Sequence, residues 1–400
     1  PKNKYLLLLA IAWLLFSANG NSQEAFSFDS ILNKKTILKT VSDQAKKYRL
    51  QIIYTQITRN AQGVPAFKNY TYHLDSTNYF YCASLVKLPC SILALEKLND
   101  LKLDKNTIMF TDSANNCQHT VKKDTTSPNA YPSVAQYIRR MLLVSDNVAY
   151  GRVYEFLGVD YLHDRLSALG YKNMRIVHRF DGGCKGTDNT ITNPVSFYSN
   201  DIKLLYQQKQ QVSARVYVSP IGTIKVGKAY YNAQNKKIHE PKDFTNMNYM
   251  SLQNIHSILQ RVLFNPYQPK SQQFNLTKED QVFLMQYLTM LPRESSHPTY
   301  DKSYHDSYKK YFIYGDSKKP ISHYDIKVTN IVGQSYGFMV DCAYIHNEKE
   351  HVEFMLSAVI YANEDEVIND GKYEYNSIDL PFLAELGRQM YNYELKRKNK

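Results

Sequence analysis

Residues 78–98 read NYFYCASLVKLPCSILALEKL, and this stretch decides the fold. Its apolar side chains recur at helical spacing from Ser84 onward, which predicts a buried helix over about 84–101. Ser84 and Lys87 stand three residues apart at the start of that helix, so their side chains point the same way and can come within hydrogen-bonding distance. A buried amine loses its proton more readily and can accept one from a serine hydroxyl. The pair therefore indicates an activated nucleophile.

The same Ser-x-x-Lys spacing occurs a second time, at 307–310 (SYKK), so the tetrad alone is a weak signal. The second copy stands in a polar stretch rich in Tyr and Lys, with no apolar stripe behind it. For either copy the alternative is a helix cap followed by a surface lysine. We expect the copy at Ser84 to be the functional one, because it opens a helix that has a face to bury.

Residues 133–158 read SVAQYIRRMLLVSDNVAYGRVYEFLG and predict two helices, at 134–144 and about 146–157. Between the helices stands Ser145-Asp146-Asn147, a triplet that occurs once in the chain. Ser and Asp are also favoured at helix N-caps, so a purely structural role is the alternative.

Both ends of the chain carry short runs of β-branched and aromatic residues bounded by turns, and the centre is helical. The expected strands are 50–57, 66–74, 326–331, 337–345 and 352–361, and the expected flanking helices are 28–48 and 379–395. This order predicts an α/β (α+β) fold, with one antiparallel-rich sheet built from both termini and a helical lobe inserted into it.

The sheet lobe is assigned to 23–80 and 322–400, and the helical lobe to 81–321. Within the helical lobe, about 200–316 is a long, basic and Tyr-rich insertion that could act as a lid, as a substrate-shaping surface or as a simple elaboration of the lobe. The insertion contains a hairpin-like piece at 214–231 and helical stretches near 250–264 and 277–291.

A third segment, NIVGQSYGFMVDCAYI at 330–345, completes an ordered set of motifs. Ser-x-x-Lys, then Ser-Asp-Asn, then a strand in the place of a Lys-Thr-Gly motif resembles the serine hydrolase superfamily of class A β-lactamases and penicillin-binding proteins, of which this chain would be an atypical member. The resemblance covers most of the chain apart from the leader and the insertion. It implies a serine β-lactamase/D,D-peptidase-like fold and acyl transfer through a covalent ester.

The resemblance also implies a role for each matching residue. Ser84 would be the acylated nucleophile and Lys87 its proton acceptor. Ser145 would pass a proton toward the leaving nitrogen, and Asn147 would bind the substrate amide. The backbone N–H groups of Ser84 and of Gln334, just after Gly333, would form the oxyanion hole.

Two positions depart from the family pattern. Ile331 stands two residues before Gly333, where the family carries a Lys, Arg or His that binds the substrate carboxylate. Lys327 is too far along the same strand to replace that cation, at roughly 3.3 Å per residue. Asp181, in Arg-Phe-Asp at 179–181, stands where class A enzymes carry the deacylating glutamate. Its alternative is a turn residue beside two glycines.

The N-terminus carries Lys2 and Lys4, the apolar run 5–16 (YLLLLAIAWLLF) and then small and polar residues, which predicts a signal peptide at about 1–22. An uncleaved anchor is the alternative; after cleavage we expect no stable membrane insertion and a periplasmic or secreted protein. The five cysteines are an odd number without metal-ligand spacing, so we expect buried free thiols and no metal, with one disulfide as the alternative.

The formal net charge of +12 suits any anionic surface, but the basic residues are scattered and no nucleic-acid-binding motif is visible, so we expect no nucleic-acid partner. No cofactor is expected either, and the oligomeric state is left open.

We expect an exported serine hydrolase that is acylated at Ser84 by a β-lactam or a peptidoglycan-derived amide. One alternative is an acyl-binding, sensory protein with little or no turnover. A lower alternative is an esterase, although such relatives place Tyr-x-Asn where this chain has Ser-Asp-Asn.

Overall fold

The computed structural model describes residues 26–114, 117, 119–180 and 183–398. The predicted signal peptide at 1–22 and the candidate Asp181 lie outside the described residues. The centre of the fold is a five-stranded sheet in which every neighbouring pair is antiparallel. Its spatial order is β10 (Lys327–Ser335), β11 (Phe338–Asn347), β12 (Val352–Tyr361), β1 (Gln51–Arg59) and β2 (Pro65–Tyr72).

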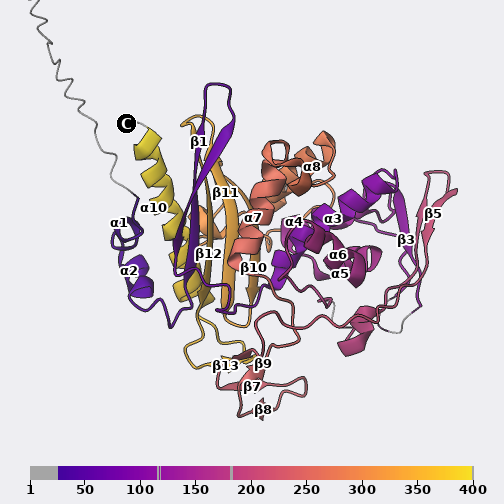
Figure 1. Ribbon diagram of the computed structural model, residues 1–400, viewed down its shortest axis with the longest axis horizontal. Coiled ribbons are helices and arrows are strands. Elements are labelled where there is room, and N and C mark those ends of the chain that lie inside the picture. Colours follow the sequence, from indigo (N-terminus) through magenta and orange to yellow (C-terminus); the bar gives the residue numbers. More distant parts are fainter. Residues whose placement is uncertain (1–25, 115–116, 118, 181–182, 399–400) are drawn as a thin grey trace, which may run out of the picture.

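The two ends of the chain meet inside this sheet. β1 pairs with β12, with Gln51 opposite Val359, so the first hairpin closes onto the last three strands. The helices that lie between these strands in sequence group together as a lobe beside the sheet (Figure 1). The prediction of one antiparallel sheet built from both termini, with an inserted helical lobe, is therefore confirmed.

Helices cover both faces of the sheet. One face packs against α10 (Leu380–Lys398) and two short helices, α1 (Asp29–Leu32) and α2 (Thr36–Ser42), and the opposite face packs against the helical lobe (Figure 1). Because neither face is open to water, a middle strand need not alternate apolar and polar residues. In β12, Glu353 is the one residue that is not buried.

The helical lobe is arranged around α3, whose first twelve residues, Lys87–Leu98, are all buried. Its main helices are α3 (Lys87–Asp100), α4 (Val134–Val144), α5 (Asn147–Leu157), α6 (Val159–Ala168), α7 (Leu252–Leu263) and α8 (Lys278–Thr289). Side chains of Ser133 and Asp146 accept hydrogen bonds from backbone N–H groups and so cap α4 and α5. The cap at Asp146 fixes where the Ser-Asp-Asn turn stands relative to α3.

Shorter elements complete the chain. They are β3 (Ile108–Thr111), β4 (Val195–Tyr198), β5 (Leu204–Gln208), β6 (Lys225–Val226), β7 (Ala229–Tyr231), β8 (Lys237–Ile238), β9 (Lys242–Asp243), β13 (Val367–Ile368) and α9 (Tyr311–Tyr314). Short 3₁₀ or π turns span Ala83–Val86, Gly186–Thr190, Asn265–Tyr267, Lys270–Gln272, Pro292–Glu294 and Tyr375–Asp379.

Two sequence predictions of local structure are wrong. The expected helix at 28–48 is two short helices separated at 33–35, where Lys35 is extended, and each helix buries its own apolar pair against the core. The expected hairpin at 214–231 is also absent: Ala229 of β7 lies opposite Val367 of β13, and β6 pairs with β9. In both places contacts with distant segments decide the backbone, and local spacing does not show them.

The cysteines divide into two groups. Cys117 and Cys184 form a disulfide across 67 residues, so the expectation of free thiols is wrong for this pair. Cys82, Cys90 and Cys342 are free and buried, as expected. Across the described ranges, every helix is too short or too polar to span a bilayer.

Candidate active site

Ser84 lies in the 3₁₀ turn Ala83–Val86 that leads into α3. The residue before it, Ala83, has a φ of 44°, in the left-handed region that costs energy for a residue with a Cβ. The aromatic run Tyr79–Tyr81 and Cys82 are buried and hold the entry to the turn. The strained backbone is therefore maintained by the packing on its N-terminal side, and it presents Ser84 at a half-buried position.

Lys87 is fully buried, and its amine is surrounded by the candidate residues. Its Nζ lies 2.8 Å from Oγ of Ser84, 2.9 Å from Oγ of Ser145 and 2.7 Å from Oδ1 of Asn147. It also lies 2.6 Å from the backbone oxygen of Ser145. The helical spacing of Ser84 and Lys87 therefore brings their side chains within hydrogen-bonding distance, as the sequence predicted.

The second motif approaches this amine from the end of α4. Ser145 has a φ of 63°, which turns both its carbonyl and its hydroxyl toward Lys87, and its Oγ lies 2.6 Å from Oγ of Ser84. Asp146 points elsewhere: it caps α5 and pairs with Arg140 at 2.8 Å. The triplet thus combines the structural role of a cap, at its middle residue, with two side chains that contact the Ser84–Lys87 pair.

The surroundings of Lys87 disfavour its protonated form. Burial lowers the pKa of its amine well below the ordinary lysine value, the positive charge of Lys309 lowers that pKa further, and Asp146 opposes the shift. An amine with a lowered pKa can accept the hydroxyl proton of a serine at neutral pH. The arrangement can therefore support a nucleophilic attack by Ser84.

The loop that carries Asp181 reaches the site through Phe180, a residue that the sequence analysis did not single out. The ring centroid of Phe180 lies 5.5 Å from Nζ of Lys87, and the ring stacks on Tyr150 at 4.8 Å. Arg179, just before it, is buried and pairs with Glu155 at 3.1 Å. The place of Phe180 between Arg179 and Asp181 was the sequence signal from which its contact with the site could have been predicted. The placement of Asp181 itself lies outside the described residues.

The edge strand β10 lies beside the nucleophile through Gly333. A Cβ at this position would be 2.7 Å from the carbonyl oxygen of Cys82, which is closer than a Cβ can stand to a backbone atom. Gln334 is exposed next to it, and its Oε1 accepts a hydrogen bond from Tyr311 at 3.2 Å. Both predicted residues of the third motif therefore lie at the sheet edge next to the Ser84 turn.

Position 331 makes no polar contribution to the site. Ile331 is fully buried in the core between the sheet and the helical lobe. The ammonium of Lys327 lies 4.2 Å from the ring centroid of Tyr324, farther back on the strand. The departure noted in the sequence is therefore real in three dimensions: the side chain at this strand position is hydrocarbon.

The second Ser-x-x-Lys copy is not a paired nucleophile and base. Ser307 donates a hydrogen bond to the backbone oxygen of Ser317, and Nζ of Lys310 donates to the backbone oxygens of Leu288 and Val328. Although this stretch is polar and has no apolar stripe, Ser307, Lys309 and Lys310 are all buried. The physical reason is that β10 is an edge strand with carbonyl groups that need donors, and the segment at 307–312 lies along that edge.

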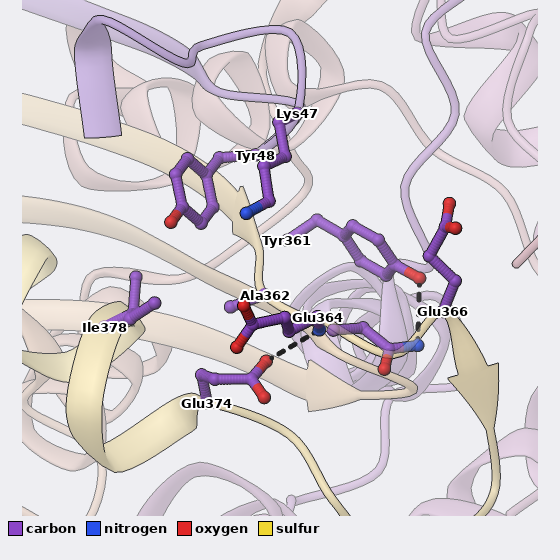
Figure 2. A pocket seen from close by; sticks show the side chains of 9 residues that line it. Lys47, Tyr48, Tyr361, Ala362, Glu364, Glu366, Glu374 and Ile378 are labelled. Carbon is purple, nitrogen blue, oxygen red and sulfur yellow. Dashed lines mark hydrogen bonds between the residues drawn. The ribbon is translucent and has the colours of Figure 1, made fainter. Parts of the chain in front are cut away.

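A separate pocket of about 250 Å³ lies at the C-terminal end of β12 (Figure 2). Glu364, Glu366 and Glu374 line it, together with Lys47 and Tyr48. No serine, threonine or cysteine is among its lining residues, so it offers no aliphatic hydroxyl or thiol. Throughout the part of the chain that the structure describes, no three His, Cys, Asp or Glu side chains are grouped so that they could hold a metal ion.

Comparisons with known proteins agree with the motif pattern. The family described as the beta-lactamase enzyme family matches residues 34–393. No curated protein matches the chain. Among solved structures, the chain is similar to the class A beta-lactamase from Clostridium kluyveri, with 12% identity, 89% of this chain and 97% of that chain covered, and a TM-score of 0.46. It is also similar to the beta-lactamase from Sphaerobacter thermophilus, with 10% identity, coverage of 91% and 96%, and a TM-score of 0.47.

Proposed function

This chain belongs to the beta-lactamase enzyme family, and from that premise we propose that it is a serine hydrolase that forms an acyl-enzyme at Ser84. The substrate is a β-lactam or a peptide amide derived from peptidoglycan. The observation that carries the proposal is the fully buried Lys87 amine, 2.8 Å from Oγ of Ser84. A buried amine with a lowered pKa is the base that a serine nucleophile needs.

In the proposed acylation, Oγ of Ser84 gives its proton to Nζ of Lys87 and forms a bond to the carbonyl carbon. The carbon–nitrogen bond then breaks, and Ser145 passes a proton to the departing nitrogen and takes one back from Lys87. The distances of 2.6 Å between the two hydroxyls and 2.9 Å from Oγ of Ser145 to Nζ support this route. Asn147 orients the substrate amide, and the N–H groups of Ser84 and Gln334 bind the oxyanion.

Deacylation requires a water molecule that attacks the ester carbon, with release of the acid and return of the proton to Ser84. We propose Asp181 as the group that activates this water. Its carboxylate is one methylene shorter than that of a glutamate, so slow hydrolysis is expected.

A second candidate function is acyl binding with little or no turnover. The hydrocarbon side chain of Ile331 favours this reading, because the strand position two residues before Gly333 offers no charge to a substrate carboxylate. The difference between the two candidates lies only in the lifetime of the ester.

We further propose that the protein acts in the periplasm or after secretion. The disulfide between Cys117 and Cys184 supports this location, because such bonds persist in oxidising compartments.

Intact-mass measurement of the purified protein after addition of a penicillin tests the function. An adduct on the wild type and none on Ser84→Ala is expected. A rapid return to the native mass indicates a hydrolase, and a lasting adduct indicates a binder. Release of D-Ala from a D-Ala-D-Ala peptide, with the same control, tests the peptidase reaction. Absence of any adduct and of any released D-Ala would contradict the proposal.

A further inference from the structure

Lys309 brings a second buried amine toward the active site from the edge of the sheet. Its Nζ donates a hydrogen bond of 2.5 Å to the backbone oxygen of Leu142, in the last turn of α4. Leu142 stands three residues before Ser145, the residue whose carbonyl and hydroxyl contact Lys87. Lys309 therefore anchors the turn that presents the Ser-Asp-Asn motif.

The backbone around Lys309 is fixed to the sheet by a buried polar cluster. Nδ2 of Asn330, on β10, donates to the backbone oxygen of Lys309 at 2.6 Å and to Oδ1 of Asp341 at 2.8 Å. Oδ2 of Asp341, on β11, accepts a hydrogen bond of 3.0 Å from the backbone N–H of Phe312. The position of the Lys309 amine is thus built by two strands and is not a rotamer of a free surface side chain.

The charges around the two amines differ. Asp341 favours the protonated form of Lys309, whose pKa is lowered by burial to about 7. For Lys87, the positive charge of Lys309 disfavours the protonated form and lowers the pKa, and only Asp146, in the α4–α5 turn, favours that form. The positive charge of Lys309 also lowers the pKa of Lys310 on its own segment, which in turn faces Glu294 and Lys327.

We propose that Lys309 is a positioning residue for the acylation step: its hydrogen bond to Leu142 fixes the turn that carries Ser145, whose backbone oxygen and hydroxyl contact the Lys87 amine. The inference rests on the proposed function, in which Lys87 is the base. The positive charge of Lys309 adds to burial in lowering the pKa of Lys87, whereas Asp341 favours the protonated form of Lys309. Ile331 leaves β10 without a cation two residues before Gly333. Lys309 supplies a cation from the segment at 307–312, which lies along the edge of that strand.

The pH dependence of Ser84 acylation by a penicillin tests the proposal. The rate in the wild type rises with pH as Lys87 loses its proton. In Lys309→Met this rise is expected to move to higher pH by at least about one unit, so that acylation slows about tenfold at pH values below the wild-type rise. Lys310→Met is the matched control, because it removes an adjacent buried amine that bonds to Leu288 and Val328 instead. Its rise is expected to stay at the wild-type pH. An unmoved rise in a folded Lys309→Met protein, or an equal movement in both variants, would overturn the proposal.

A second measurement needs no substrate. The ¹³C shift of lysine Cε reports protonation, and the signals of Lys87 and Lys309 are identified by their correlation with assigned backbone resonances. Wild-type protein is expected to contain a pH range in which Lys309 is charged and Lys87 is neutral. The reverse order of titration overturns the proposal. If no adduct forms at any pH but Lys87 titrates at higher pH in Lys309→Met than in the wild type, the effect of Lys309 on Lys87 stands and only the proposed function fails.

Discussion

At the scale of single residues, two atoms of Ser145 face the Lys87 amine, the backbone oxygen at 2.6 Å and Oγ at 2.9 Å. The same Oγ lies 2.6 Å from Oγ of Ser84. The hydroxyl therefore connects the candidate nucleophile with the candidate base, although these two are also in direct contact at 2.8 Å. The backbone oxygen anchors the amine whatever side chain stands at position 145.

Removal of this hydroxyl is expected to slow acylation without abolishing it. Ser145→Ala keeps the direct contact between Ser84 and Lys87 but loses the proton path to the leaving nitrogen, so the rate of ester formation should fall about 10²–10⁴-fold. Stopped-flow or quenched mass measurements of adduct formation provide the check. Ser91→Ala is a matched control, since Oγ of Ser91 donates to the backbone oxygen of Lys87 and does not reach its amine. Equal rates in Ser145→Ala and wild type would show that Ser145 carries no proton.

Sequence reasoning at this scale predicted the residues that meet and missed one that lies beside them. Ser84 and Lys87 share a turn of backbone, so their contact follows from local geometry. The burial of Lys309 does not follow from its neighbours in sequence, which are polar or aromatic on both sides. A lysine is rarely buried, and the carbonyl of Leu142 that receives it comes from a helix far away in the chain.

At the scale of elements, the relation between β10 and the 3₁₀ turn at Ala83–Val86 determines the width of the site. Gly333 is the point of closest approach, with the carbonyl oxygen of Cys82 and Cβ of Ala83 on the other side. The proposed oxyanion hole, formed by the backbone N–H groups of Gln334 and Ser84, depends on a strand held this near to the turn. A larger residue at position 333 must push the two elements apart.

Gly333→Ala is therefore expected to reduce acylation at least about tenfold and to lower the free energy of unfolding by about 1–3 kcal/mol, since the new methyl group meets backbone and not a flexible side chain. Thermal or urea unfolding and the rate of adduct formation give the two readouts. Ser335→Ala, two positions along the same strand, is the control and should change neither by much. A Gly333→Ala protein with wild-type acylation would contradict the role given to this contact.

Most elements were predictable because their signal is local. The helices α4, α5 and α10 and the strands β1, β11 and β12 begin and end close to the predicted residues, and each carries an uninterrupted apolar pattern. The segment 28–48 was predicted as one helix because apolar residues from Ile31 to Ala45 recur near helical spacing. The break at 33–35 comes from how its two apolar pairs, Ile31 with Leu32 and Leu38 with Val41, pack against the core.

At the scale of the whole molecule, a buried histidine joins the helical lobe to the sheet. His256, on α7, lies 2.7 Å from Oγ1 of Thr55 on β1 through Nε2, and 2.7 Å from Oγ of Ser357 on β12 through Nδ1. Burial lowers the pKa of His256 to about 4. The neutral ring is therefore the form that the folded protein holds.

This histidine predicts a loss of stability in mild acid. An unfolded histidine takes up its proton near pH 6.5, whereas the folded one does so only near pH 4, so its contribution is complete above pH 6.5 and falls as the pH drops toward 4. The share of His256 is about 3 kcal/mol in the free energy of unfolding. Urea unfolding of wild type and His256→Gln at pH 8 and pH 4.5 measures it: the difference between the two proteins at pH 8 reports lost packing, and its change at pH 4.5 reports titration. A fall of the same size in both proteins would show that other groups cause it.

The sequence by itself determined what depends on spacing along the chain: the Ser84–Lys87 pair on one turn, the Ser-Asp-Asn turn between two helices, and the sheet strands at both ends. The tertiary structure alone decided which of the two Ser-x-x-Lys tetrads holds its serine and lysine in contact. It also decided that Cys117 pairs with Cys184 and that the Lys309 amine bonds to Leu142 in the last turn of α4. The physical reason is that a periodic pattern shows which face of an element is buried but not which distant segment covers it. Contacts between such segments arise only when the lobes pack together.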